Sequence, residues 1–214
     1  MKKSGALILI TCCLLFSACG KKKESLAQNT PTPAATTQDT ASPPADSSQD
    51  DAERARKQGL LDYATMEDLY INDPHAQWAS SATASSTYGG NEAVNATGPV
   101  DGKEWTNGQL DIGVDWLQLE FAKPVRATEV RVVFGDGGLG AEAVSKVELE
   151  DVDGRWVTVW SGLSDTKIDS RGARTWFVRK FDKTQGLTKG VKVTIANNVQ
   201  SGYKNVDAVQ LVGE

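Results

Sequence analysis

Thiol and imidazole side chains are scarce in this sequence of 214 residues. Its three cysteines, Cys12, Cys13 and Cys19, all lie near the N-terminus, and His75 is its one histidine. A disulfide framework is therefore excluded for the rest of the chain. A zinc site built from thiols and imidazoles is also disfavoured, and so is a hydrolase triad that needs a histidine base. The stability of any folded domain must come from an ordinary apolar core.

Positive charge is in the minority. Lys and Arg number 23 against 28 Asp and Glu, which gives a formal net charge of -5. Removal of Lys2 and Lys3 with a leader would make the chain still more acidic. No stretch interleaves basic and aromatic residues, as nucleic-acid-binding surfaces do. We therefore expect no nucleic-acid partner.

The N-terminus has the features of an export signal. Lys2 and Lys3 precede an apolar run over residues 6–16, which is too short to span a bilayer. The run ends in Phe-Ser-Ala-Cys at residues 16–19, which resembles the lipobox of bacterial lipoproteins. We predict a signal peptide over residues 1–18 and lipidation of Cys19, with an ordinary cleavable signal as the alternative. No aspartate follows the cysteine, which favours the outer membrane if the cell is Gram-negative.

Two segments separate the leader from the C-terminal domain. Residues 19–50 consist mostly of small and polar residues without aromatics, so we expect a disordered, lipidated tether. Residues 51–75 are expected to form a short helical connector, because charged residues there surround a narrow apolar stripe. Gly59 is expected to interrupt or end this helix, and Pro74 is the latest point at which it can end.

From residue 76 onward the apolar pattern has a period of two. Leu117, Leu119 and Phe121 alternate with polar residues, and later segments repeat this alternation. The pattern is typical of half-buried antiparallel strands, and clusters of Gly, Asp, Asn and Pro separate about eight of them. We predict an all-β domain over residues 76–214, a jelly-roll β-sandwich of about eight antiparallel strands.

Short motifs follow one another in a particular order along this domain. They are Ala-Thr-Ala-Ser-Ser at 82–86, Asn-Ala-Thr-Gly-Pro at 95–99, Asp-Gly at 101–102, Asp-Trp-Leu-Gln-Leu-Glu-Phe at 115–121 and Val-Asp-Ala-Val-Gln-Leu-Val-Gly at 206–213. The order resembles that of discoidin domains, also named galactose-binding-like or coagulation-factor C-type domains. The resemblance implies a jelly roll whose loops at one end bind a ligand, often a glycan and sometimes a lipid head group or a protein. The cysteine pair that joins the ends of the vertebrate domains is absent, which argues against lipid binding of the blood-protein kind.

Recognition of a sugar requires an aromatic platform with planar polar groups around it. Tyr88 and Tyr203 are the best candidates for the platform, because turn-forming residues surround both of them. Asn107, Asp136 and Asn198 also lie in predicted loops and complete the candidate ligand-binding set. Each tyrosine could equally anchor its own loop, and the sequence leaves this alternative open.

The resemblance also implies a structural Ca²⁺ ion beside the ligand loops. Asp101 and Asp207 occupy the positions nearest to the family's metal ligands, and carbonyl oxygens of an Asp-Gly turn can supply further ligands. Lys103 departs from the family's threonine, which puts one ligand in doubt. The alternative is that Asp101 only caps a turn and that Asp207 only bonds to backbone groups.

Together these features predict a non-catalytic, membrane-anchored lipoprotein that recognises a carbohydrate of the envelope or its surroundings. The alternative is a docking or assembly factor that binds another envelope protein. A hydrolase is less favoured, because carboxylate pairs such as Asp151 and Asp153 fall in predicted turns, although a two-carboxylate glycosidase stays open. The glycine-rich segment 135–140 joins two predicted strands and opens no helix, so it is not expected to bind phosphate.

Overall fold

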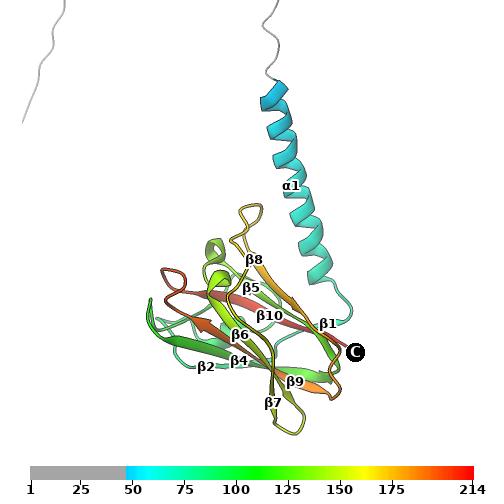
Figure 1. Ribbon diagram of the computed structural model, residues 1–214, viewed down its shortest axis with the longest axis vertical. Helices are drawn as coiled ribbons and strands as arrows, with labels where there is room; N and C mark the ends of the chain where they lie inside the picture. Colours follow the sequence, from blue (N-terminus) through cyan, green and yellow to red (C-terminus); the bar gives the residue numbers. More distant parts are fainter. Residues whose placement is uncertain (1–46) are drawn as a thin grey trace, which may run out of the picture. The chain divides into compact units, whose positions relative to one another are not determined.

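The computed structural model describes residues 47–214, which contain one α-helix, ten β-strands and three short 3-10 turns (Figure 1). The predicted signal peptide, the lipidation site Cys19 and most of the predicted tether lie outside the described residues. In the part that is described, none of the helical structure is both long and apolar enough to cross a membrane.

The connector is one long helix, α1 (Ser47–Ile71), of 25 residues, which is roughly 37 Å at 1.5 Å per residue. It takes in residues assigned above to the tether and continues through Gly59, so the predicted helix before the sandwich is present but its expected interruption or end near Gly59 is wrong. One glycine costs only about 1 kcal/mol relative to alanine, and the flanking Arg, Lys, Gln and Leu residues favour the helix. After α1, the N–H of Asn72 still donates to the Asp68 carbonyl (3.0 Å), two residues before Pro74.

Two five-stranded antiparallel sheets form the sandwich. Sheet A contains β1 (Ala76–Trp78), β3 (Trp105–Thr106), β5 (Ala127–Phe134), β8 (Thr175–Lys180) and β10 (Asn205–Gly213). Sheet B contains β2 (Ser81–Ala84), β4 (Val114–Val125), β6 (Val144–Asp151), β7 (Trp156–Ser161) and β9 (Thr188–Ala196). The strand orders are β1-β10-β5-β8, with β3 also paired to β10, and β2-β4-β9-β6-β7. Eight of these strands have four residues or more, which confirms the predicted jelly-roll sandwich.

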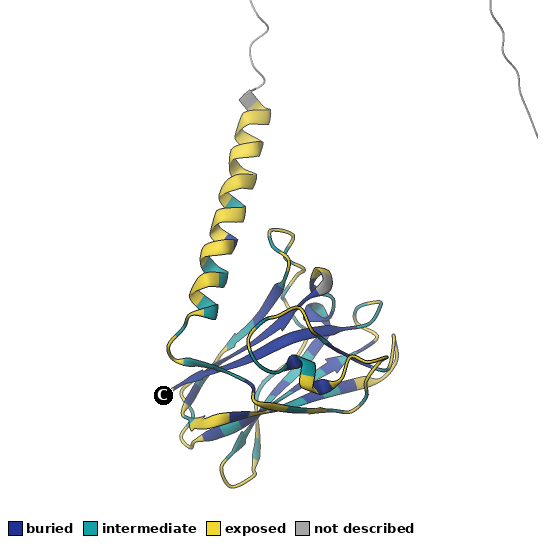
Figure 2. Ribbon diagram, turned by 180° about the vertical axis from the view of Figure 1, so that it is seen from behind, coloured by how far each residue is buried: buried dark blue, intermediate teal, exposed yellow. Residues whose placement is uncertain are grey.

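Alternation along the strands builds the core between the sheets. Leu117 and Leu119 of β4 are fully buried, and so is Val193 of β9. The residues next to each of them along the strand are more exposed. Strand β10 differs, because all nine of its residues are buried, as the dark blue ribbon in Figure 2 shows. It lies inside sheet A with the core on one face, and Ala208 on its other face belongs to the cluster against which α1 packs.

The C-terminal half of α1 packs on the outer face of sheet A. Tyr63 is buried and its hydroxyl donates a hydrogen bond to the Arg174 carbonyl (2.9 Å). A Cβ atom added at Gly172 would overlap the ring of Tyr63, so the helix and this loop fit closely. Further along, the rings of Tyr70 and Trp176 lie with their centroids 5.2 Å apart. The N-terminal half of the helix is exposed (Figure 2).

The Tyr63 phenol should make the stability of the protein sensitive to alkaline pH. Burial, followed by the charge of Glu67 and the hydrogen bond to it, raises the pKa of Tyr63 from 10.0 to about 12. Its contribution to the free energy of unfolding is therefore complete below pH 10 and is lost as the pH rises from 10 towards 12. We expect Tyr63→Phe to flatten the decline of that free energy in this pH range, as urea denaturation would measure. An equally steep decline in both proteins would contradict the assignment.

Candidate functional site

Four connections between strands gather at one end of the sandwich. They follow β2, β3, β5 and β9 and cover residues 85–92, 107–113, 135–143 and 197–204. Hydrogen bonds join them: the N–H of Gly202 donates to the Asp111 carboxylate (2.8 Å), and the N–H of Gly140 donates to the side-chain oxygen of Gln200 (2.7 Å). We name these four segments the loop end.

Two of the predicted site residues meet at the loop end. The rings of Tyr88 and Tyr203 stack with their centroids 4.1 Å apart and an angle of 26° between their planes. Tyr88 is 50% exposed and Tyr203 is half-buried, so the pair presents aromatic surface to solvent. The backbone N–H of Tyr88 donates to the Thr106 carbonyl (3.0 Å), which holds the first loop against β3. The pair is therefore an aromatic platform that two separate loops build.

Exposed aliphatic side chains lie on the same loops. Leu110, Ile112 and Val199 are 45%, 70% and 45% exposed. Their loops are joined by the Asn197 side chain, which donates to the Ile112 carbonyl (3.0 Å). Clustered apolar side chains on a protein surface mark sites that bind ligands or partners. These three residues were not predicted from the sequence, because polar and aromatic side chains are the usual marks of a sugar site; large aliphatic residues among glycines were the available signal.

A buried lysine holds the loop end together. The side chain of Lys204 is fully buried, and its ammonium group donates to the carbonyls of Leu110 (2.8 Å), Asn197 (2.8 Å) and Gly202. An ammonium group has three donors, so these bonds use all of them. Burial lowers the pKa of Lys204, and the Asp111 carboxylate, 3.6 Å from the ammonium, opposes this change. Gly202 and Asn197 are near this lysine in the chain, but Leu110 lies 94 residues away, and the three carbonyls meet only in the folded loop end, so the local sequence does not distinguish Lys204.

Asn107 lies beneath the loop surface and not on it. It is fully buried, and its side-chain oxygen accepts a hydrogen bond from the backbone N–H of Lys204 (2.8 Å). Its side-chain nitrogen donates to the side chains of Asn197 (3.0 Å) and Asp115 (3.3 Å). Asp115 also accepts bonds from two serine hydroxyls of residues 85–92, at 2.6 Å each. Burial would raise the pKa of Asp115, but these hydrogen bonds outweigh it and lower the pKa. The structure thus corrects the prediction for Asn107, which supports the loops and has no exposed surface for a ligand.

The other two predicted contacts are placed differently. Asn198 is exposed in the turn after β9, on the same loop as Tyr203. The backbone of Asp136 lies in a short 3-10 turn (Asp136–Gly138), but its side chain is outside the described part of the structure. Among the predicted ligand contacts, Tyr88, Asn198 and Tyr203 therefore lie where a ligand at the loop end could reach them.

The two predicted metal ligands have other partners. Asp207 is 1% exposed, and one of its oxygens accepts hydrogen bonds from the N–H groups of Asp101 (3.1 Å) and Gly102 (3.3 Å). Its other oxygen accepts from Nε of Arg174 (3.0 Å). The Asp101 carboxylate pairs with Nζ of Lys103 at 2.7 Å. Across residues 47–214, no group of three or more His, Cys, Asp or Glu residues is arranged to hold a metal ion.

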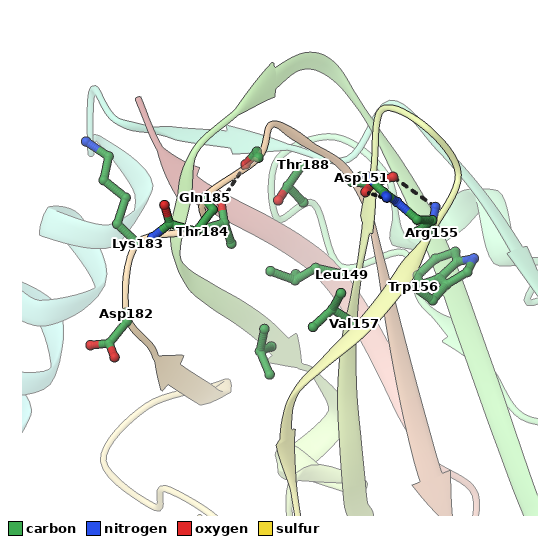
Figure 3. Close-up of a pocket in the computed structure, with 12 residues that line it drawn as sticks. Leu149, Asp151, Arg155, Trp156, Val157, Asp182, Lys183, Thr184, Gln185 and Thr188 are labelled. Carbon is green, nitrogen blue, oxygen red and sulfur yellow. Dashed lines mark hydrogen bonds and ion pairs between the residues drawn. The ribbon is translucent and has the colours of Figure 1, made fainter.

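A groove of about 740 Å³ lies at the opposite end of the sandwich, between the β6–β7 turn and residues 182–187. Figure 3 shows the aliphatic side chains of Leu149 and Val157 at its centre and Arg155, bonded to Asp151 (2.9 Å), at its rim. Strand β7 borders the groove and pairs with β6 alone among the described strands. The sequence did not predict this groove, because it arises where the two sheets separate at their edge.

Comparison with known proteins identifies the fold. No family model and no curated protein matches the sequence. The module CBM32-3 from a family 31 glycoside hydrolase of Clostridium perfringens has a TM-score of 0.50 at 14% identity, covering 65% of this chain and 96% of that one. The family 32 module of C. perfringens NanJ, solved with galactose, has a TM-score of 0.47 at 16% identity (66% and 96% covered). A mutant lectin binding domain of Lectinolysin, solved with Lewis b, has 0.47 at 20% identity (63% and 92% covered).

The predicted resemblance is confirmed at the level of fold. The CBM32-3 module has the galactose-binding-like, or discoidin-like, jelly roll, and it matches 65% of this chain. Sequence identities this low establish the architecture and leave the ligand of this chain to be argued from its own residues.

Loss of the Lys204 ammonium should loosen the loop end. Lys204→Met keeps a side chain of similar length but leaves three carbonyls without their donor, and an unsatisfied buried polar group costs about 1–3 kcal/mol. We expect the free energy of unfolding to fall by about 2 kcal/mol or more, and amide hydrogens of residues 107–113 to exchange faster by mass spectrometry. Lys180→Met, at a side chain that is 77% exposed, is the control. Equal stability of the two variants would refute this role for Lys204.

Proposed function

We propose that this protein is a non-catalytic binding protein that recognises carbohydrate at the loop end. The observation that carries the proposal is the stacked pair Tyr88 and Tyr203, exposed to solvent on two loops of a fold that carbohydrate-binding modules share. The apolar face of a sugar ring packs on an aromatic ring, and nearby polar groups bond to its hydroxyls. Asn198 and Asp111 are two polar side chains on the same loops that could do this.

The construction of the loop end supports a binding role. Lys204, Asn107 and Asp115 form a buried hydrogen-bonded network directly below the exposed side chains. Such a network fixes the backbone of the loops before any ligand arrives, so binding costs little ordering entropy. Rigid loops that carry exposed aromatic and aliphatic side chains are what a preformed recognition surface requires.

The charges of the loop end favour uncharged sugars or amino sugars over acidic ones. Its four segments contain the acidic residues Glu92, Asp111, Asp136 and Glu142 and a single basic residue, Lys204. Because the Lys204 ammonium is buried and already makes three hydrogen bonds, it offers nothing to the carboxylate of a uronic or sialic acid. The local field instead repels an anion.

The carboxylates of the loop end support binding without catalysis. A glycosidase needs one carboxylic acid with a raised pKa and a second carboxylate at a set distance from it. Asp115 is 2% exposed and its pKa is lowered by hydrogen bonds, so it is held as a carboxylate away from solvent. Asp111 is bonded to the N–H of Gly202 (2.8 Å). Asp115 therefore does not serve as the proton donor for a glycosidic bond.

We also propose that the protein is exported and anchored to the membrane by lipid. The lipobox-like residues 16–19 predict that Cys19 carries lipid in the cell envelope, with the outer membrane favoured, and the polar tether and α1 then space the sandwich from the membrane. The described domain needs no cysteine for its core, which agrees with a mature chain whose one cysteine is acylated.

A second candidate function is docking of another envelope protein, and one observation favours it. Strand β7 has the sequence Trp-Val-Thr-Val-Trp-Ser, which contains no charged residue and no proline. Its edge away from β6 is free beside the apolar groove of Figure 3. Natural edge strands usually carry charges or proline that block pairing with another chain. An extended peptide could add to β7 and place apolar side chains in the groove.

The aromatic platform gives the central test. We expect Tyr88→Ala and Tyr203→Ala each to weaken glycan binding by about tenfold or more, because truncation of a central aromatic contact costs at least 1.4 kcal/mol. A glycan array that holds neutral, amino and acidic sugars, followed by calorimetry, measures this. Binding should be confined to neutral and amino sugars. Val157→Ala, in the distant groove, is the matched control and should bind as the wild type does.

Two results would overturn the carbohydrate proposal. One is an array without a hit for the folded protein. The other is a stoichiometric protein partner in detergent extracts that Val157→Lys releases and Tyr88→Ala does not, since that pattern would favour docking at β7. Turnover of any arrayed glycan would contradict the non-catalytic role.

Anchoring is tested separately. Expression of the full chain in bacteria grown with labelled palmitate should label the wild type and leave Cys19→Ala unlabelled, because Cys19 would be the only acylated residue of the mature protein. In membrane fractionation, the Cys19→Ala variant should be absent from the outer-membrane fraction, in which the wild type is found. Equal labelling of Cys19→Ala, or none in the wild type, would contradict the lipoprotein assignment.

A further inference from the structure

The residues that the resemblance offers for Ca²⁺ do not fit the ion. Calcium takes six to eight oxygen ligands. Both oxygens of the buried Asp207 carboxylate instead accept hydrogen bonds from N–H groups, two from the backbone of Asp101 and Gly102 and one from Arg174. These groups direct hydrogens and a guanidinium charge towards the position that a cation would need. A divalent ion there would meet like charge in a poorly solvated setting.

Arg174 reaches two carboxylates from different parts of the fold. Its Nε lies 3.0 Å from Asp207 of β10, and its Nη1 lies 3.5 Å from Glu67 of α1. Glu67 also accepts hydrogen bonds from the hydroxyl of Tyr63 (3.1 Å) and the indole N–H of Trp176 (3.3 Å). The guanidinium thus lies between a carboxylate of the sandwich and a carboxylate of the helix.

The surroundings keep this arginine charged and ordered. The Arg174 side chain is 25% exposed, and burial opposes its charge, but the hydrogen bond and charge of Asp207, with those of Glu67, outweigh burial and raise its pKa. Its own carbonyl accepts a hydrogen bond from Tyr63 (2.9 Å), so both the backbone and the side chain of Arg174 contact α1 residues. Arg174 and Asp207 line a cavity of about 330 Å³ together with Glu104.

We propose that Arg174 is the permanent internal cation of this site, which neutralises Asp207 in place of a metal ion and couples the Asp101–Gly102 turn and β10 to helix α1. The domain then folds, and holds its helix, without calcium. This inference is independent of whether the loop end binds a sugar.

The first test measures metal dependence in the unmodified protein. The full chain is purified in detergent, dialysed against EDTA, and melted with EDTA or with millimolar CaCl₂. A metal present at 100 times its dissociation constant would raise the melting temperature by roughly 5 to 10 °C. We expect no shift between the two conditions. A calcium-dependent rise of that size would overturn the proposal.

The second test replaces the arginine. Arg174→Gln removes the charge and should lower the melting temperature and speed amide exchange at residues 60–71, because Glu67 loses its counter-ion. Arg155→Gln, at a side chain that is 75% exposed in the β6–β7 turn, is the control and should leave both unchanged. Arg174→Lys keeps the charge without the planar geometry that reaches two carboxylates. Its melting temperature and amide exchange should lie between those of Arg174→Gln and the control, and it replaces Arg174→Gln in the comparison if that variant does not fold. Equal behaviour of the variants at 155 and 174 would overturn the coupling role.

Discussion

The rest of the structure depends on one constraint: strand β10 is buried along its whole length and yet contains polar side chains. A buried polar group without a partner costs about 1–3 kcal/mol, so each of these side chains must be satisfied by a neighbouring segment. Asp207 holds the Asp101–Gly102 turn and Arg174, and Gln210 donates to the Tyr70 carbonyl of α1 (2.9 Å). Lys204, just before the strand, holds the loop end. The hydrogen bonds that these buried side chains require thus position the helix, the turn and the candidate site.

The two surfaces suited to recognition lie at opposite ends of the sandwich. The loop end combines exposed aromatic and aliphatic side chains with a polar network beneath them, whereas the edge groove combines an aliphatic floor with the free backbone of β7. They differ in chemistry, since one offers ring faces and the other offers backbone hydrogen bonds. A ligand on one would not exclude a ligand on the other, so a glycan and a protein partner could be held together.

Local patterns were sufficient to predict the strands, because alternation of apolar and polar residues is a property of neighbours in sequence. The order of motifs likewise led to the discoidin-like fold, and the turn-forming residues around Tyr88 and Tyr203 led to these two rings. What failed depended on distant partners. The bond between Arg174 and Glu67 joins residues 107 apart in the chain, and the burial of Asn107 follows from loops that meet only after folding. The continuation of the helix through Gly59 was also not predicted. Helix formation is cooperative, so the helix propensities of many neighbouring residues together outweigh that of one glycine.

The loop end has one further consequence for how such a protein could diversify. Every hydrogen bond of the Lys204 ammonium goes to a main-chain carbonyl, and a main-chain carbonyl is present whatever side chain its residue carries. Replacing Leu110 would therefore leave the shape of the loop unchanged while altering what it presents outward. At such a position the exposed side chain can change without loss of the hydrogen bond that holds the loop, so descendants of this gene could alter what the loop presents while keeping its structure.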